Sequence, residues 1–245
     1  MRIAFLSDIH GNAVALEAVL ADIEKQRIDQ IYVLGDIAYR GPEPKRSIQL
    51  VQSLQTTVIK GNADEWTVRG VQAGEVREDL LEMMNREREW TIDRLDESDL
   101  IYLRNLPDEF QLQLTDSLRL HAFHATKESL FDIVLPDASV EQLQTKILSE
   151  QAAITVYAHI HLPYVRYMNG KCLINTGSVG LPFDGLPLAS YAVVEAENNR
   201  YRATIERVPY DLDKVVEQFT SGEYPNAETM IRVIRQAKSP FIPAK

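Results

Sequence analysis

The sequence begins with RIAFLSDIHGN (residues 2–12), an apolar run rich in strand-forming residues that ends in aspartate, histidine and glycine. Residues 12–25 then repeat apolar side chains at helical spacing, which predicts a helix. The alternation continues with an apolar run at 30–36, a helical pattern with proline near its start at 42–54, and a third apolar run at 56–62. Strand, helix, strand, helix, strand is typical of a mainly parallel sheet with helices packed on it.

The pattern changes after the third predicted strand. Residues 64–107 are charged, helical in periodicity and free of strand signals, and we interpret them as a helical cap inserted into a single domain that spans 1–245. Residues 118–126 and 153–161 predict strands that flank a helix at 139–150. The fold class expected is therefore α/β with a cap.

The last part of the chain predicts antiparallel strands. Residues 164–180 and 190–210 carry strand-forming residues around turn signals at Asn169-Gly170 and Asn198-Asn199. Residues 211–222 predict a closing helix that stops at Gly222.

Composition limits the classes of partner and the compartment. The 245-residue chain has a formal net charge of −10, which disfavours nucleic acid and anionic membrane surfaces as partners. Its one cysteine, Cys172, excludes an intrachain disulfide, and its N-terminal apolar run is too short for a signal peptide or a membrane span. We expect a cytoplasmic protein, and the sequence predicts no oligomeric state.

Polar side chains follow the predicted strands, at the ends that converge on one crevice in an open α/β sheet. Taken singly, an aspartate at a strand end is usually a turn former or helix N-cap, and a histidine in an apolar run is usually a core residue. Here all five histidines of the chain fall at or just before strand ends. The candidate metal ligands are Asp8, His10, Asp36, Asn62, His124, His159 and His161.

Carboxylate, amide and imidazole donors without thiolates suit Mn, Fe or Zn. Seven ligands are too many for one ion that keeps an open position, and they suit two ions that share one carboxylate. Two ions about 3.5–4 Å apart can clamp a phosphoryl group and activate a water molecule near neutral pH. The residues therefore predict a two-metal phosphate site.

At this point the motifs resemble those of the calcineurin-like metallophosphoesterases. The resemblance rests on DIHGN at 8–12, GD at 35–36, GNAD at 61–64, His124 and AHIH at 158–161. NTGSVG at 175–180 resembles a segment of the small bacterial and archaeal phosphodiesterase-like branch, and the resemblance runs to about residue 194.

The resemblance implies a four-layer αββα sandwich and hydrolysis of a phosphate ester by metal-hydroxide attack. It implies two divalent ions, with Mn preferred and Fe, Zn, Ni or Mg as alternatives. One ion would be held by Asp8, His10, Asp36 and His161, and the other by Asp36, Asn62, His124 and His159, so that Asp36 bridges. Asp36, Asn62 and His124 would also belong to the catalytic machinery.

Two departures from the family pattern concern histidines. Both His121 and His124 lie near the end of one predicted strand, and we favour His124 as the ligand because it follows the longer apolar run. Odd spacing would put His121 on the opposite strand face. Ala63 occupies the place where the family usually has the histidine that protonates the leaving oxygen. Diesters and phosphoanhydrides with good leaving groups are therefore favoured over alkyl monoesters.

Other side chains are candidates for substrate contact. Arg40 lies in GDIAYRG (35–41) where the serine/threonine protein phosphatases have an arginine that holds phosphate, although a solvated loop residue is an equal alternative. Asn12 and Ser178 are candidates for contacting substrate or orienting ligands. In the cap, Trp66, Trp90, Met83 and Met84 are expected in the core first and in a nucleobase pocket second.

These observations predict hydrolysis of a small phosphodiester or a dinucleoside polyphosphate, with a small phosphate ester or nucleotide as the partner. The alternatives are a protein phosphatase, which Arg40 favours, and a non-catalytic scaffold such as the retromer subunit that resembles this fold.

Overall fold

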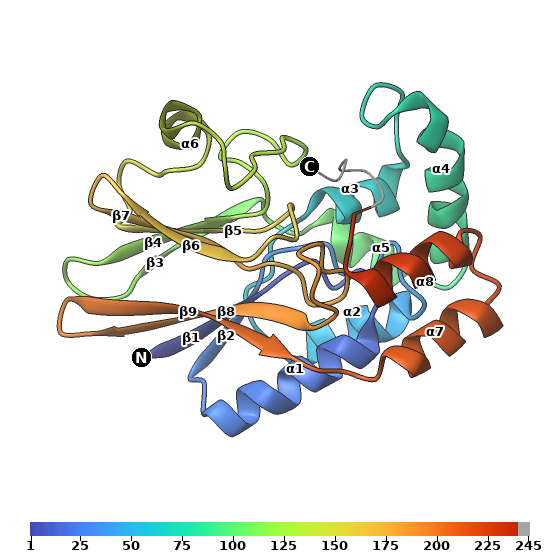
Figure 1. Ribbon diagram of the computed structural model, residues 1–245, viewed down its shortest axis with the longest axis horizontal. Coiled ribbons are helices and arrows are strands. Elements are labelled where there is room, and N and C mark those ends of the chain that lie inside the picture. The colour runs from blue at the N-terminus through green and yellow to red at the C-terminus, as the bar shows by residue number, and fades with distance from the viewer. Residues whose placement is uncertain (240–245) are drawn as a thin grey trace.

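The strands pair into two mixed sheets in the computed structural model, which describes residues 1–239 (Figure 1). The first sheet has the order β2-β1-β8-β9. In it β1 runs parallel to β2 and antiparallel to β8, and β8 runs antiparallel to β9. Its strands are β1 (Arg2–Leu6), β2 (Gln30–Val33), β8 (Ala189–Glu197) and β9 (Arg200–Val208).

The second sheet has the order β3-β4-β5-β7-β6, with β4, β5 and β7 parallel. Its strands are β3 (Glu109–Gln113), β4 (Arg119–Phe123), β5 (Ile154–Tyr157), β6 (Tyr164–Met168) and β7 (Lys171–Asn175). The turns expected at Asn169-Gly170 and Asn198-Asn199 join β6 to β7 and β8 to β9, and all four residues have positive φ. That conformation suits the right-handed twist of a hairpin, which confirms both turns.

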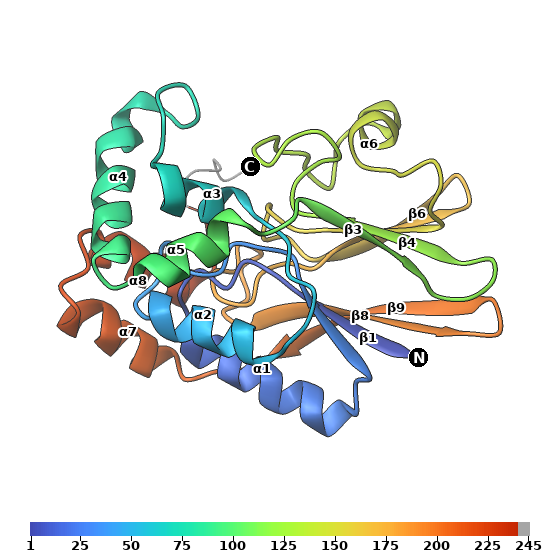
Figure 2. The same ribbon diagram turned by 180° about the vertical axis from the view of Figure 1, so that it is seen from behind.

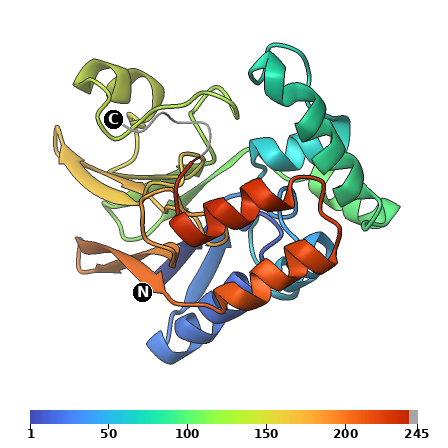
Figure 3. The ribbon, with the colours of Figure 1, turned by 45° about the vertical axis from the view of Figure 1, so that its right-hand side comes forward.

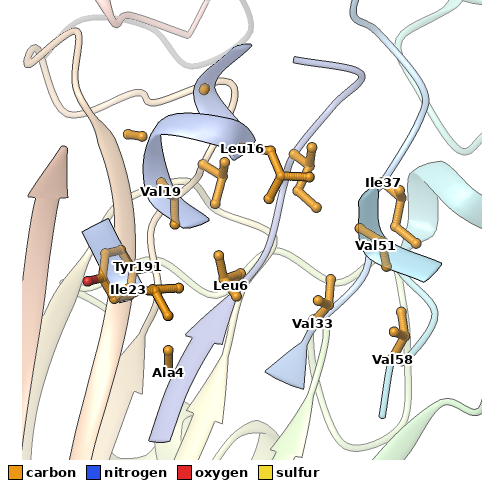
Figure 4. Close-up of a cluster of buried hydrophobic side chains, with 14 of the residues drawn as sticks. Ala4, Leu6, Leu16, Val19, Ile23, Val33, Ile37, Val51, Val58 and Tyr191 are labelled. Atoms are coloured by element: carbon orange, nitrogen blue, oxygen red, sulfur yellow. The ribbon is translucent and has the colours of Figure 1, made fainter. Parts of the chain in front are cut away.

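The two sheets pack face to face through buried apolar side chains. Ile3 and Phe5 of β1 belong to one buried cluster with Leu120 and Ala122 of β4. Because side chains alternate across a strand, Ala4 and Leu6 point the other way, into a cluster with α1 (Ala13–Gln26) and α2 (Pro44–Ser53) (Figure 4).

The second sheet is covered on its own outer face. Phe123, Tyr157 and Leu173 form a buried cluster with Leu143 and Ile147 at α6 (Val140–Lys146). In Figure 1, α6 lies above the two sheets and α1 below them. Two mixed sheets with flanking helices are the α/β fold that the sequence led us to expect.

The remaining helices lie beyond one end of the sheets (Figure 2). α3 (Asn62–Arg69), α4 (Glu78–Ile92) and α5 (Glu97–Arg104) occupy the region expected to be helical. α7 (Leu212–Ser221) confirms the closing helix, and α8 (Ala227–Gln236) packs beside it (Figure 3). Within residues 1–239, no helix has the length and hydropathy needed to cross a bilayer.

The structure differs from the sequence prediction in three elements. The strand predicted at 56–62 was wrong, because only Val58 bridges Val33 and Asn62 already begins α3. Asp64 accepts the N–H of Gly61 at 2.9 Å, and this cap favours a helix start over a strand end. β3 and α8 were not predicted.

The packing between the sheets predicts the effect of shortening Phe5, whose side chain is fully buried. Phe5→Ala should lower the free energy of unfolding by about 3–5 kcal/mol, since it removes apolar contacts and leaves a cavity. Urea unfolding measures this loss. Val140→Ala is the control, because Val140 is 47% exposed and its truncation should change stability by about 0.5 kcal/mol or less. Equal losses in both variants would contradict the packing described.

Candidate metal centre

The loop after β1 is hydrogen-bonded on two sides, and these bonds gather the predicted ligands. On one side Asp8 and His10 donate their N–H groups to the carbonyls of Gly35 and Asp36, at 3.1 and 2.9 Å. On the other side Gly180, which follows β7 of the second sheet, donates to the carbonyl of Asp8 at 3.0 Å. The ends of the two sheets are therefore tied together at the site.

Two glycines allow this close approach. A Cβ on Gly41 would lie 1.7 Å from the carbonyl oxygen of His10, and one on Gly180 would lie 1.8 Å from that of Ile9. Neither distance is possible for a side chain, so both positions must be glycine for the loop after β1 to keep its place.

Left-handed backbone aims the ligands into the site. Asp8, His10, Asp36, His159 and His161 have φ values of 52°, 48°, 58°, 70° and 56°. Strand alternation does not aim the two histidines of AHIH, because β5 ends at Tyr157 and both residues lie in the loop beyond it. Such conformations are costly for residues other than glycine and are typical of functional sites.

Four of the predicted ligands form one compact buried group: Asp8, His10, Asp36 and His161. Their potential ligand atoms all lie within 4.8 Å of one another. His161 Nε2 lies 3.2 Å from Asp8 Oδ1, and His10 Nε2 lies 3.2 Å from His161 Nε2 and 3.5 Å from Asp36 Oδ2.

The protonation states of these side chains favour binding of a cation between them. Backbone carbonyls accept the Nδ1–H of His10 at 2.8 Å and that of His161 at 2.5 Å, which leaves both Nε2 lone pairs facing each other. Burial lowers the pKa of His10 to about 4, so its ring is neutral at physiological pH. Asp8 Oδ1 finds no hydrogen-bond donor within the described chain. A divalent ion fits these donors, since it satisfies the lone pairs at once and the carbonyls fix the rings behind it.

A second group lies on the other side of Asp36. Asn62 Oδ1 lies 3.0 Å from His124 Nε2 and 2.7 Å from His159 Nδ1, and His124 Nε2 lies 3.5 Å from Asp36 Oδ2. His124 Nδ1 donates to the carbonyl of Leu34 at 2.6 Å. Asp36 therefore lies within reach of both groups, as a bridging carboxylate would.

Electrostatics distinguish the two histidines of this group. Burial disfavours charge on His124, but the neighbouring Asp36 carboxylate outweighs it and raises the pKa of His124 to about 9. Burial lowers the pKa of His159 to about 4, and its buried Nε2 meets no partner among residues 1–239. The imidazoles around Asp36 outweigh the effect of burial and hold the pKa of Asp36 well below its ordinary range.

Asp64 orients Asp36, and the sequence analysis did not assign it this role. Its carboxylate accepts the N–H groups of Asp36, Ile37 and Gly61 at 2.8, 2.9 and 2.9 Å. In turn Asp36 Oδ1 accepts the N–H of Ala63 at 2.8 Å. The signal in the sequence was the acidic residue in the first turn of a helix that starts at Asn62.

The structure separates His121, which lies in β4, from His124, which directly follows it. His121 Nε2 lies 2.8 Å from Glu109 Oε2 on the neighbouring strand β3, whereas His124 lies among Asn62, Asp36 and His159. This placement supports the choice of His124 as the candidate ligand.

A cleft of about 390 Å³ is lined by five of the seven candidate metal ligands, namely His10, Asp36, Asn62, His159 and His161, and Arg40 also lines it. Arg40 is 8% exposed, and its Nε lies 3.1 Å from Glu87 Oε2 of α4. Glu87 Oε1 accepts a hydrogen bond from Asn226, and the Arg40 guanidinium contacts Met230 Sδ at 3.7 Å. Arg40 is thus a buried, paired residue rather than a solvated one, and phosphate binding by it stays a prediction.

The side chains of Asn12 and Ser178 form hydrogen bonds with backbone groups. Asn12 accepts the N–H of Ala15 at 3.0 Å as the N-cap of α1 and donates to the Gly180 carbonyl at 3.0 Å. Ser178 Oγ donates to the Asp8 carbonyl at 2.7 Å. These contacts support a role in orienting the ligand loop, and substrate contact by Asn12 stays a prediction.

The aromatic and methionine residues of the expected cap divide between core and cleft. Trp66 and Met84 belong to a buried cluster with Tyr39 and also line the cleft. Trp90 instead packs in the core against Phe219 and Tyr224 near α7. Phe131, Ile133 and Phe183 also line the cleft, and the sequence analysis missed them.

Comparison with known proteins agrees with this geometry. Residues 1–199 match the family described as the calcineurin-like phosphoesterase superfamily domain. The uncharacterized protein MJ0912 of Methanocaldococcus jannaschii is 27% identical over 243 residues, which cover 91% of this chain and 93% of that protein.

Two solved structures resemble the chain over nearly its full length. A metallophosphoesterase from Sphaerobacter thermophilus is 27% identical with a TM-score of 0.78, and the hypothetical protein PH1004 from Pyrococcus horikoshii OT3 is 21% identical with a TM-score of 0.80. Each similarity covers 97% of this chain and 99% of the other. With its buried Asp and His cluster, the chain belongs to the calcineurin-like phosphoesterase superfamily and is a metal-dependent phosphoesterase.

Proposed function

We propose that the protein hydrolyses small phosphodiesters or dinucleoside polyphosphates with two divalent ions, of which manganese is the preferred one. The observation that carries the proposal is the position of Asp36 between two groups of buried donors. His10, Asp8 and His161 would hold one ion with Asp36, and Asn62, His124 and His159 would hold the other.

Bound ions would polarise the phosphoryl group and activate the water that attacks it. The chain's own residues fix the donors before substrate arrives, because the Nδ1 atoms of His10, His124 and His161 are each bound to a backbone carbonyl. His124 must lose its Nε2 proton to become a ligand, so that ion binding at the second position would release a proton.

The residue at position 63 supports a preference for leaving groups of low pKa. Ala63 lies beside Asn62 in the cleft lining, where it offers a methyl group instead of a proton donor. A leaving group of low pKa needs no protonation as it departs, so aryl esters and phosphoanhydrides suit this site better than alkyl monoesters.

The capping role expected for residues 64–107 is also part of this proposal. Helices α3 and α4 contribute Trp66, Leu80 and Met84 to the cleft, which supports a capping role for α3–α5 over the bound substrate. Arg40, on which the protein phosphatase alternative depends, is paired with Glu87. A non-catalytic scaffold that only binds partners would not need two groups of buried donors, so the scaffold alternative leaves these groups unexplained.

Activity with added metal tests the proposed function. The manganese-loaded protein should hydrolyse an aryl phosphodiester and a dinucleoside tetraphosphate faster than an aryl phosphomonoester. A chelator should abolish all turnover, because the donors act through bound ions. Product release is measured for the three compounds side by side. Absence of turnover of all three by metal-loaded protein would contradict the proposal and favour the scaffold alternative.

Metal content tests the second ion position. His124→Ala should lower the manganese bound per chain by about one ion, because it removes a donor that faces Asn62 and Asp36. His121→Ala is the matched control from the adjoining strand β4 and should retain the metal content of the unmodified protein. Elemental analysis after dialysis measures both. Loss of metal only in the His121 variant would reject His124 as the ligand.

A histidine at position 63 tests the leaving-group argument. Ala63→His should raise the ratio of monoesterase to diesterase rate by at least about tenfold, because it supplies a general acid. Ala63→Gln controls for side-chain size without proton transfer. Steady-state rates on an alkyl phosphomonoester and on the aryl diester measure the ratio, and an unchanged ratio in the histidine variant would refute this account of Ala63.

A further inference from the structure

Apart from the candidate metal ligands, the cleft is lined largely by apolar side chains. These come from α3, from α4 and the segment between these helices, from the segment after β4 and from the segment after β7. The side chains that carry the argument are Trp66, Val76, Met84, Phe131, Ile133 and Phe183, which we call the apolar wall. A substrate whose phosphate lies at the metal end would therefore extend its remaining part along hydrocarbon and aromatic surface.

The polar groups beside the apolar wall are already paired. Trp66 Nε1 donates to Glu75 Oε2 at 3.0 Å, so the indole presents its ring to the cleft. Glu75 also accepts hydrogen bonds from Arg69 and from the N–H of Gln72. Arg77 pairs with Asp79 at 2.5 Å, as Arg40 pairs with Glu87. A polar substrate group would compete with these partners for the same hydrogen-bonding side chains.

The apolar lining begins directly beside the candidate metal ligands. Ala63 adjoins Asn62, and Trp66 follows about one turn later on α3, so that the same helix supplies a metal-facing amide and apolar neighbours. Ile133 also lines the cleft, and this large apolar residue is 62% exposed. A hydrocarbon group bound there would remove Ile133 from water.

We propose that the apolar wall binds an apolar ester arm, aryl or hydrocarbon, of a phosphodiester whose phosphate lies at the metal centre. This inference rests on the proposed function and narrows its substrate class. A nucleoside arm is disfavoured, because the polar edge of the base would lie against apolar side chains and paired polar groups, and would lose hydrogen bonds to water without replacement.

Three diesters with the same leaving group test the inference: the 4-nitrophenyl esters of phenyl phosphate, methyl phosphate and thymidine 5′-phosphate. With manganese-loaded protein, kcat/KM for the phenyl ester should exceed that for each of the other two by at least about tenfold, as expected from burial of one ring. Equal values for the phenyl and methyl esters would overturn the proposal, and so would the highest value for the thymidine ester.

A binding measurement separates this inference from the proposed function. Calorimetry of manganese-loaded protein should give a dissociation constant for phenylphosphonate at least about tenfold below that for methylphosphonate. This binding measurement does not require turnover, so it tests the inference even if the protein hydrolyses none of the esters. Equal dissociation constants would overturn the apolar wall as a binding surface, whatever the activity.

A charged side chain introduced into the apolar wall gives a variant that tests the inference. Ile133→Asp should reduce the preference for phenylphosphonate over methylphosphonate to about threefold or less, because the arm would then lie beside a carboxylate. Val140→Asp is the control, since Val140 is similarly exposed at the start of α6 and does not line the cleft. An unchanged preference in the Ile133 variant, or the same loss in the control, would contradict the proposal.

Discussion

The backbone of residues 7–11 lies between two other segments and is hydrogen-bonded to both, and the rest of the site depends on this arrangement. The segment after β2 bonds it from the same sheet, and the segment after β7 bonds it from the other sheet. Gly41 and Gly180 leave room for the approach. Asp8 and His10 are therefore held by both halves of the fold, and a shift of either sheet would separate the ligands.

Within that frame, the donors for a metal ion are held close together before any ion is present. Carbonyl groups hold the Nδ1 protons of three imidazoles, and the opposite nitrogens then converge on Asp8, Asp36 and Asn62. Left-handed backbone at five of the ligands carries a further cost. Binding of an ion offsets the unfavourable free energy of the crowded donors and of the left-handed backbone. This explains why a protein would keep such an arrangement in a buried position.

Much of this site could be predicted because its ligands follow strands directly in the sequence. Asp8, Asp36, His124 and His159 each come one to three residues after an apolar run, and the end of a parallel strand fixes where the next residues go. The roles of Asp64 and Glu87 could not be predicted, because they depend on backbone N–H groups and an ion pair brought together by tertiary packing. Ile133 and Phe183 lie in irregular segments whose course no periodicity encodes. The strand expected at 56–62 failed because a helix cap competed with strand propensity.

The contact between Glu87 and Asn226 links the cleft to a part of the chain outside the family match. That match ends at residue 199, yet α8 touches the Arg40 and Glu87 pair through Met230 and Asn226. Substitutions in α8 can therefore alter the shape of the cleft without changing a single candidate ligand. Metal ligation and the shape of the cleft are thus encoded in separate parts of the sequence, because every candidate ligand precedes α8.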